Sequence, residues 1–162
     1  MVVRSLARWL PGLLLVVGAA LPVQAQYTFD PSGPDVNRTF HLDRTVVGPD
    51  GQEYRVRGDL HIVLHARERG GDVAIRGHAN SEGISVNQLR GPRSYRAVGS
   101  TPIEHYVEHP RRRASDLRTS LSYDLISRGG GRDFRLVVHL DGRMTSDYAL
   151  AVGVSRVDLL PR

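Results

Sequence analysis

The feature that most constrains this chain is an alternation of apolar and polar residues over positions 54–67, followed by a glycine pair. A period of two predicts a long β-strand with one buried and one solvent-exposed face. Gly70 and Gly71 supply the positive φ angles of a tight hairpin turn. The expected buried face comprises Tyr54, Val56, Gly58, Leu60, Ile62, Leu64 and Ala66, and continues after the turn with Val73, Ile75, Gly77 and Ala79. The expected exposed face comprises Arg55, Arg57, Asp59, His61, Val63, His65 and Arg67.

Similar alternation predicts further strands over residues 36–47, 94–100, 116–128, 133–145 and 148–159. Segments rich in turn-forming residues separate them, at 48–51, 89–92, 129–131 and 146–147. Residues 81–93 fit either a short strand or a bulged continuation of the second hairpin strand. Residues 101–114 fit a continued strand followed by a polar loop. The apolar parity runs straight through Gly142, which predicts a kink or bulge at that glycine and no turn.

These segments predict an all-β fold of seven or eight antiparallel strands, connected mostly as a meander. We expect a small, flattened barrel, because closure removes the exposed edges of an open sheet. A sandwich of two packed sheets is the alternative. Residues 36–162 form a single β domain in this interpretation. Residues 26–35 contain two prolines and a glycine, which predicts an irregular lead-in.

The first 25 residues are typical of a signal peptide. Arg4 and Arg8 precede an apolar run at residues 10–21, and Val23-Gln24-Ala25 fits the small-x-small rule for cleavage before Gln26. The run has about a dozen residues, whereas a membrane-spanning helix needs about 20. We therefore expect an exported protein, periplasmic or extracellular, with no transmembrane span in the mature chain. The chain has no cysteine, so disulfides cannot stabilise it.

The charge of the chain excludes some partners. All 22 basic residues are arginine, and removal of Arg4 and Arg8 leaves 20 basic and 17 acidic residues, a net charge of +3. This excess is too small to indicate nucleic-acid binding, which usually needs a clearly basic face.

Several short sequence segments resemble those of an uncharacterised family of small exported bacterial all-β proteins. They lie at residues 58–65, 78–84, 95–99, 123–131 and 134–139, so the similarity spans residues 40–159, nearly the whole mature chain. Members of that family often carry cysteines in the first hairpin turn and at the end of the last strand, where this chain has residues 48–51 and 157–159 without cysteine. The resemblance implies a β fold and export, and it implies no known activity.

No segment carries a recognisable catalytic motif: the chain lacks a cysteine nucleophile, a Gly-x-Ser-x-Gly elbow, a His-Glu-x-x-His motif and a phosphate loop. Serine, histidine and aspartate occur on the expected exposed faces, but a triad is defined by geometry and not by sequence. We therefore expect a non-enzymatic protein without a cofactor.

Histidines give weak candidates for a metal site. The turn at residues 70–71 places His78 opposite Val63 and diagonal to His61 and His65. Since strand residues advance roughly 3.3 Å each, His61 and His65 are about 13 Å apart, too far for both to bind one zinc ion. A site that uses His78 and one neighbour stays open, and a solvated face is the alternative.

Two surfaces could bind a ligand. Small residues beside large ones on the buried face could leave a cavity for a small apolar ligand, lined by Tyr54, Leu60, Ile62, Leu64, Phe134 and Leu136. Alternatively, an arginine-rich loop could bind an acidic glycan or lipopolysaccharide, through Arg111, Arg112, Arg113 and Arg118. The sequence thus predicts an exported binding protein, with the interior ligand as the first hypothesis and the arginine surface as the second.

Overall fold

The computed structural model describes residues 24–28, 36–110, 113–127, 133–147 and 149–162. The described residues form nine strands and no helix. The strands are β1 (Gln24–Thr28), β2 (Val36–Val47), β3 (Glu53–Arg69), β4 (Asp72–Gln88), β5 (Ser94–Val98), β6 (Ser100–Val107), β7 (Ser115–Ser127), β8 (Phe134–Met144) and β9 (Ala149–Pro161). The bounds of β2 are those predicted from the sequence, and β3 and β4 meet at the predicted turn at Gly70 and Gly71.

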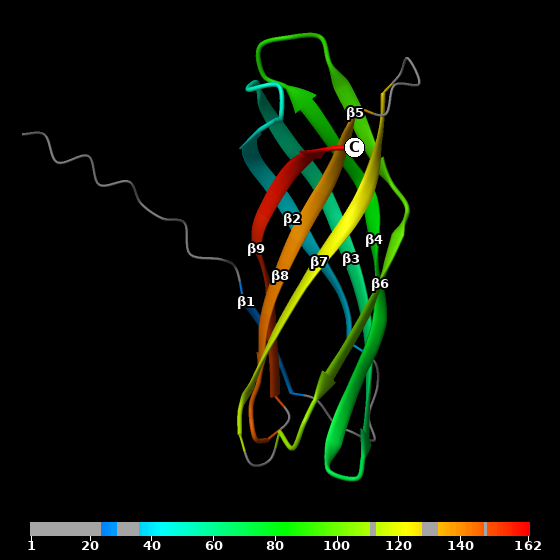
Figure 1. Cartoon of the computed structure of the whole chain (residues 1–162), viewed down its shortest axis with the longest axis vertical. Helices are drawn as coiled ribbons and strands as arrows, with labels where there is room; N and C mark the ends of the chain where they lie inside the picture. Colours follow the sequence, from blue (N-terminus) through cyan, green and yellow to red (C-terminus); the bar gives the residue numbers. More distant parts are fainter. Residues whose placement is uncertain (1–23, 29–35, 111–112, 128–132, 148) are drawn as a thin grey trace, which may run out of the picture.

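All strand pairs are antiparallel, in the order β1-β9-β8-β7-β5-β4-β3-β2, and β6 also pairs with β4. β5 and β6 are one strand interrupted at Gly99, which has a positive φ of 111°. β2 approaches β9 and brings the two ends of the sheet together. The result is a nearly closed, barrel-like sheet of eight antiparallel strands (Figure 1), which confirms the predicted fold class.

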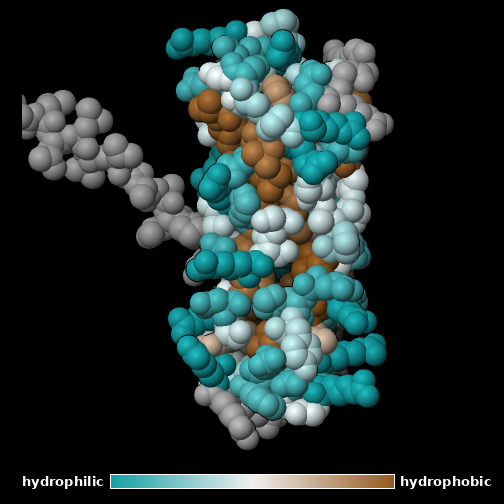
Figure 2. All heavy atoms as spheres, viewed as in Figure 1, coloured by the Kyte–Doolittle hydropathy of each residue, from teal (hydrophilic) through white to brown (hydrophobic). Residues whose placement is uncertain are grey.

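The interior of the barrel is filled by the residues that the alternation assigns to the buried face. On β3, Tyr54, Leu60 and Ile62 are 0–1% exposed, whereas Arg57 and His65, of the other parity, are exposed. On the face shown in Figure 2, polar side chains cover much of the surface, and apolar atoms are visible between them. Each strand therefore contributes one face to a single core, as period-two alternation requires.

The sequence left two interpretations of residues 81–93, a short strand or a bulged continuation, and a β-bulge decides between them. Between Arg57 and Asp59 the β3–β4 register shifts, so that Gly58 alone faces Gly83 and Ile84. Gly83 has a φ of 65°, and a Cβ on Gly58 would lie 2.6 Å from the Cα of Ile84, so both positions require glycine. Buried positions on β4 consequently change from odd numbers, up to 79, to even numbers, from 84. β4 is a bulged continuation and not a separate short strand.

A second bulge lies in β9, and the prediction of a bulge at Gly142 is wrong. The register of β8 with both neighbours is continuous at Gly142. The register with β9 alone shifts between His139 and Leu140, where Ser155 of β9 is the extra residue. Gly142 is needed for a close approach, since a Cβ there would lie 2.7 Å from the carbonyl oxygen of Ala151.

The predicted irregular lead-in at residues 26–35 is wrong in its first three residues. Gln26, Tyr27 and Thr28 belong to β1, which pairs with β9 from Ala149 to Gly153. Residues 26–28 have little local alternation, but their backbone hydrogen bonds to the free edge of β9 make them a strand. The described residues leave out residues 29–35, most of the predicted signal peptide (residues 1–23), the whole predicted turn at 129–131 and Tyr148.

The barrel has two ends that are useful for locating sites. The lower end in Figure 1 carries the β3–β4 turn, the end of β6, the start of β7 and the end of β8. The upper end carries the β2–β3 turn, the β4–β5 turn and the C-terminus. Among the described residues there is no helix with the length and apolar character that a membrane span requires.

Candidate anion-binding surface

The six residues proposed to line an interior ligand site all lie in the core. Tyr54, Leu60, Ile62 and Leu136 are 0–1% exposed, Leu64 is 3% exposed and Phe134 is 6% exposed. An internal space large enough for water would leave accessible surface on the side chains around it. Tyr54 and Phe134 instead form an edge-to-face pair, with ring centroids 5.6 Å apart. These contacts give the interior-ligand hypothesis no supporting observation, and it stays a prediction.

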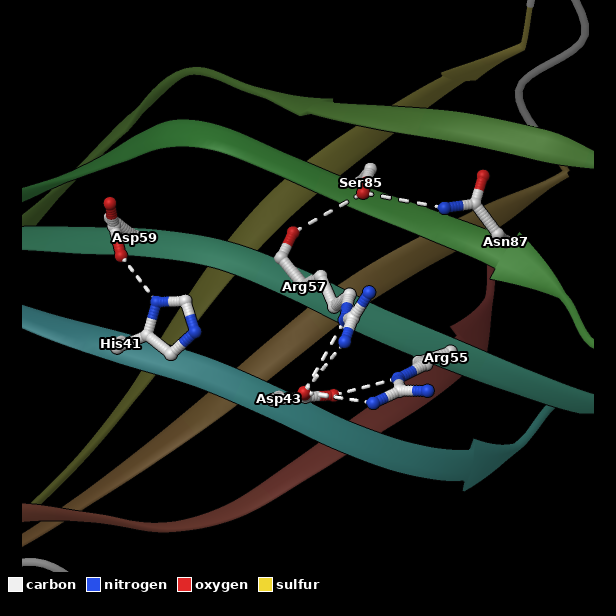
Figure 3. Close-up of polar contacts among 7 residues, drawn as sticks. All are labelled: His41, Asp43, Arg55, Arg57, Asp59, Ser85 and Asn87. Carbon is white, nitrogen blue, oxygen red and sulfur yellow. Dashed lines mark hydrogen bonds and ion pairs between the residues drawn. The ribbon is translucent and has the colours of Figure 1, made fainter.

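The upper part of β3 carries arginines that are neutralised within the sheet. Arg55 Nε and Nη2 donate to Asp43 of β2 at 2.8 and 2.9 Å, and Arg57 Nη2 donates to the same carboxylate at 3.2 Å (Figure 3). The hydrogen bonds from Arg55, and then those from Arg57, hold the pKa of Asp43 well below its usual range. Asp43 therefore stays ionised and occupies both guanidinium groups. We call Asp43, Arg55 and Arg57 the upper charge cluster.

Most of the surface histidines are paired with carboxylates. His41 Nδ1 lies 2.8 Å from Asp59, a contact marked in Figure 3, and His61 Nδ1 lies 3.2 Å from Glu82. His78 faces Val63, as the turn predicted. The described residues include no group of three histidine, aspartate or glutamate side chains placed to hold a metal ion.

The lower part of β3 carries arginines in a different setting. Arg67 lies opposite Ala74 of β4, and His65 lies opposite Arg76, all on the outer face of the sheet. With Arg69 these residues line a surface hollow of about 420 Å³. The small side chain of Ala74 creates the hollow, because the long side chains around it rise above its methyl group. We call His65, Arg67, Arg69, Ala74 and Arg76 the lower hairpin surface.

The three arginines of the lower hairpin surface have no ion pair with any other described residue, unlike Arg55, Arg57 and Arg93. No carboxylate side chain of the described residues lines the hollow. Three guanidinium groups around one hollow create a locally positive potential, although the net charge of the whole chain is small. Guanidinium donors also match carboxylate, sulfate and phosphate groups in a planar, bidentate geometry.

An exposed aromatic ring adjoins this surface. Tyr106 of β6 faces Ala74 across the β4–β6 pair and is 58% exposed. Its hydroxyl donates to Asp72 at 2.5 Å, and the backbone N–H of His109 donates to the same carboxylate at 3.0 Å. The bond to Asp72 raises the pKa of Tyr106, so the hydroxyl stays protonated and the ring is held in place. Tyr106, Ala74 and Arg76 also line a second, smaller hollow of about 220 Å³.

The arginine loop proposed from the sequence is only partly described. Arg111 and Arg112 lie outside the described residues. Arg113 is exposed before β7, and Arg118 is exposed on β7, where it lines a separate hollow over β7, β8 and β9. Alternation makes every polar residue of a strand an equal candidate, so the sequence missed four site residues: Arg67, Arg69, Arg76 and Tyr106. The lack of acidic residues from 60 to 67 was the available signal.

No family model, no curated protein and no solved structure matches this chain. The resemblance to an exported all-β family therefore stays a prediction, and the functional argument rests on the geometry.

Proposed function

We propose that the protein is an exported binding protein that holds an anionic saccharide on the lower hairpin surface. The observation that carries the proposal is the set Arg67, Arg69 and Arg76, three arginines around a hollow beside an exposed tyrosine, with no ion pair to any described residue. This proposal keeps the acidic ligand predicted from the sequence and moves its site from the arginine loop to the β3–β4 hairpin.

The residue types favour a sugar that bears carboxylate, sulfate or phosphate groups. The arginines supply charge-assisted hydrogen bonds to the anionic groups. The face of Tyr106 supplies an apolar platform of the kind that suits the C–H face of a sugar ring, and its hydroxyl is already occupied by Asp72. An uncharged sugar would leave the arginines unused, and a simple anion would leave the tyrosine unused.

Binding is tested by calorimetry with three probes: oligogalacturonate, lipopolysaccharide and neutral dextran. The first two probes distinguish a soluble acidic glycan from a phosphorylated lipid headgroup, and dextran controls for uncharged sugar. Three exposed ion pairs at roughly 0.5–1 kcal/mol each predict that Arg67, Arg69 and Arg76→Gln together weaken binding by about 10- to 100-fold. Binding also weakens with added salt, because the contacts are exposed.

The matched control is Arg55, Arg57 and Arg93→Gln, which removes the same charge from arginines that already have carboxylate partners. The control retains binding if the hairpin is the site. Equal losses in both triple variants would show that net charge alone attracts the ligand. Binding of dextran, or of neither acidic probe, would contradict the proposal.

A further inference from the structure

Three side chains on the outer face of β7, β8 and β9 form a hydrogen-bonded line. Ser120 Oγ lies 2.9 Å from Nδ1 of His139, and Nε2 of His139 lies 2.9 Å from Oδ2 of Asp158. Ser120 and His139 are direct partners in the β7–β8 register. Serine, histidine and a carboxylate in this order are the arrangement that activates a serine hydroxyl in hydrolases of unrelated folds.

The bulge in β9 puts Asp158 in this line. Before the bulge, the even-numbered residues of β9 point into the core, and after the bulge the odd-numbered residues do so. The buried residues on the two sides are Leu150, Val152 and Val154, then Val157 and Leu159. If β9 ran through Ser155 as a regular strand with no bulge, the even-numbered Asp158 would point inward. Bulges often re-aim a side chain in this way beside active sites.

The chemistry of Asp158 fixes the tautomer of His139. Burial tends to raise the pKa of Asp158, but the hydrogen bonds from Arg156 and His139 outweigh burial and lower it. The carboxylate is therefore ionised and can only accept, so Nε2 of a neutral His139 carries the proton. Nδ1 is then the unprotonated nitrogen, and it faces the hydroxyl of Ser120.

The hydrogen-bonded line of Ser120, His139 and Asp158 is accessible to solvent, and a surface hollow begins two residues along β7 and β8. Ser120 is exposed, and the side chains of His139 and Asp158 are 32% and 20% exposed. Arg118 and Asp141 follow on the same outer face, two residues from Ser120 and His139, about 7 Å along their strands. Both line a hollow of about 480 Å³ together with Ala149 and Ala151, whose small side chains leave the space.

We propose that Ser120 is a nucleophile that cleaves carboxylic esters, with His139 as its general base and Asp158 as the residue that orients the imidazole. The acyl group points from Ser120 toward Arg118 and Asp141, at the near edge of the hollow. Arg118 has no ion pair with another described residue and is a cationic donor two residues from Ser120 on the same face of β7. This activity goes beyond the saccharide binding proposed above, and either proposal can fail alone.

The step conserves atoms and charge. The Oγ of Ser120 attacks the carbonyl carbon while its proton passes to Nδ1 of His139. Collapse of the tetrahedral intermediate breaks the bond to the alcohol oxygen, which takes the proton from His139. Water then adds to the acyl-serine by the same route and releases the carboxylic acid.

The test is hydrolysis of p-nitrophenyl acetate by the full mature chain, with intact-mass and peptide analysis of any acetylated protein. The chain has no lysine, so the usual acceptors of nonspecific acetylation are absent. We expect acetylation at Ser120. General-base and nucleophilic contributions predict that Ser120→Ala and His139→Gln each lower the rate constant by about 100-fold.

The control is Ser122→Ala, which removes an exposed hydroxyl from the same face of β7, two residues away. Asp158→Asn separates an orienting role from a structural one, since it lowers the rate constant while circular dichroism and thermal stability stay near those of the parent protein. Acetylation that is absent, that falls elsewhere, or that is unchanged in Ser120→Ala and His139→Gln overturns the inference.

Discussion

β3 carries arginines on one outer face at both ends of the barrel, and the two groups differ in their partners. Arg55 and Arg57, in the upper charge cluster, share the carboxylate of Asp43. Arg67 and Arg69, on the lower hairpin surface, have no ion pair with a described residue. The strand, the face and the residue type are the same, so none of these explains the difference.

The neighbouring strand explains it. β2 runs from Val36, opposite Leu64, to Val47, opposite Glu53, so Asp43 lies opposite the upper arginines. Arg67 and Arg69 lie beyond the end of β2, and within the described part of the chain their strand neighbour there is β4. β4 presents Ala74 and Asp72 at this point, and Asp72 is already bound to Tyr106 and His109. Whether a surface arginine is available to a ligand is thus decided by strand register and length.

Both regions depend on the core beneath β3, and this dependence gives the largest expected effect. Ile62 lies between them on the inner face and is 1% exposed. Ile62→Ala should lower the free energy of unfolding by about 2–5 kcal/mol, because it leaves a cavity in a packed core. His61→Ala, at the next position, should cost less than about 1 kcal/mol. Chemical denaturation measures both, and equal costs would contradict the assignment of faces.

The difference between the upper and lower arginines should shrink if the lower arginines are given a carboxylate partner. Ala74→Asp places a carboxylate opposite Arg67, as Asp43 stands beside Arg55 and Arg57. Acidic saccharide binding should weaken by about 10-fold or more, although no arginine is removed. Calorimetry with oligogalacturonate measures the loss. Ser122→Asp is the control, because it adds the same charge on the outer face of β7, and an equal loss in the control would count against the local explanation.

A smaller effect should separate the two roles assigned to Tyr106. Tyr106→Phe keeps the ring and loses the hydroxyl that binds Asp72, so saccharide affinity should change by less than about threefold. Tyr106→Leu loses the aromatic face, and affinity should fall by about 3- to 10-fold. If both variants bind like the parent protein, the ring takes no part in binding.

The smallest effect concerns the pH dependence of the upper charge cluster. Since Arg55 and Arg57 lower the pKa of Asp43 in the folded state, the pair stabilises the fold above the unfolded pKa. That contribution is lost as pH falls toward the folded pKa. Asp43→Asn should therefore flatten the decline of melting temperature between about pH 4 and pH 2. A decline as steep as that of the parent protein would assign the acid sensitivity to other carboxylates.

The fold followed from the sequence wherever local alternation and tertiary burial agree. β2, the β3–β4 turn and the buried faces of β7 and β8 are as predicted, because one apolar parity runs through each strand. The bulges at Gly83 and Ser155 were harder to predict from the sequence, because an extra residue reverses the parity of buried positions without changing the composition. β1 was missed because its pairing depends on a free edge of β9, far away in sequence.

The candidate sites were predictable only as residue types. Arginines and histidines were known to lie on outer faces, but their partners depend on register between strands that are distant in sequence. The line from Ser120 to Asp158 depends on two registers and one bulge. Alternation alone carries none of this information.

The most direct test of the account is a titration of the mature protein with oligogalacturonate, followed by NMR of the arginine Nε–Hε groups. These signals report each guanidinium separately, so one experiment compares the two ends of β3. The account predicts that the signals of Arg67, Arg69 and Arg76 shift progressively and saturate, whereas those of Arg55 and Arg57 stay in place. Equal shifts at both ends, or shifts confined to Arg55 and Arg57, would contradict it.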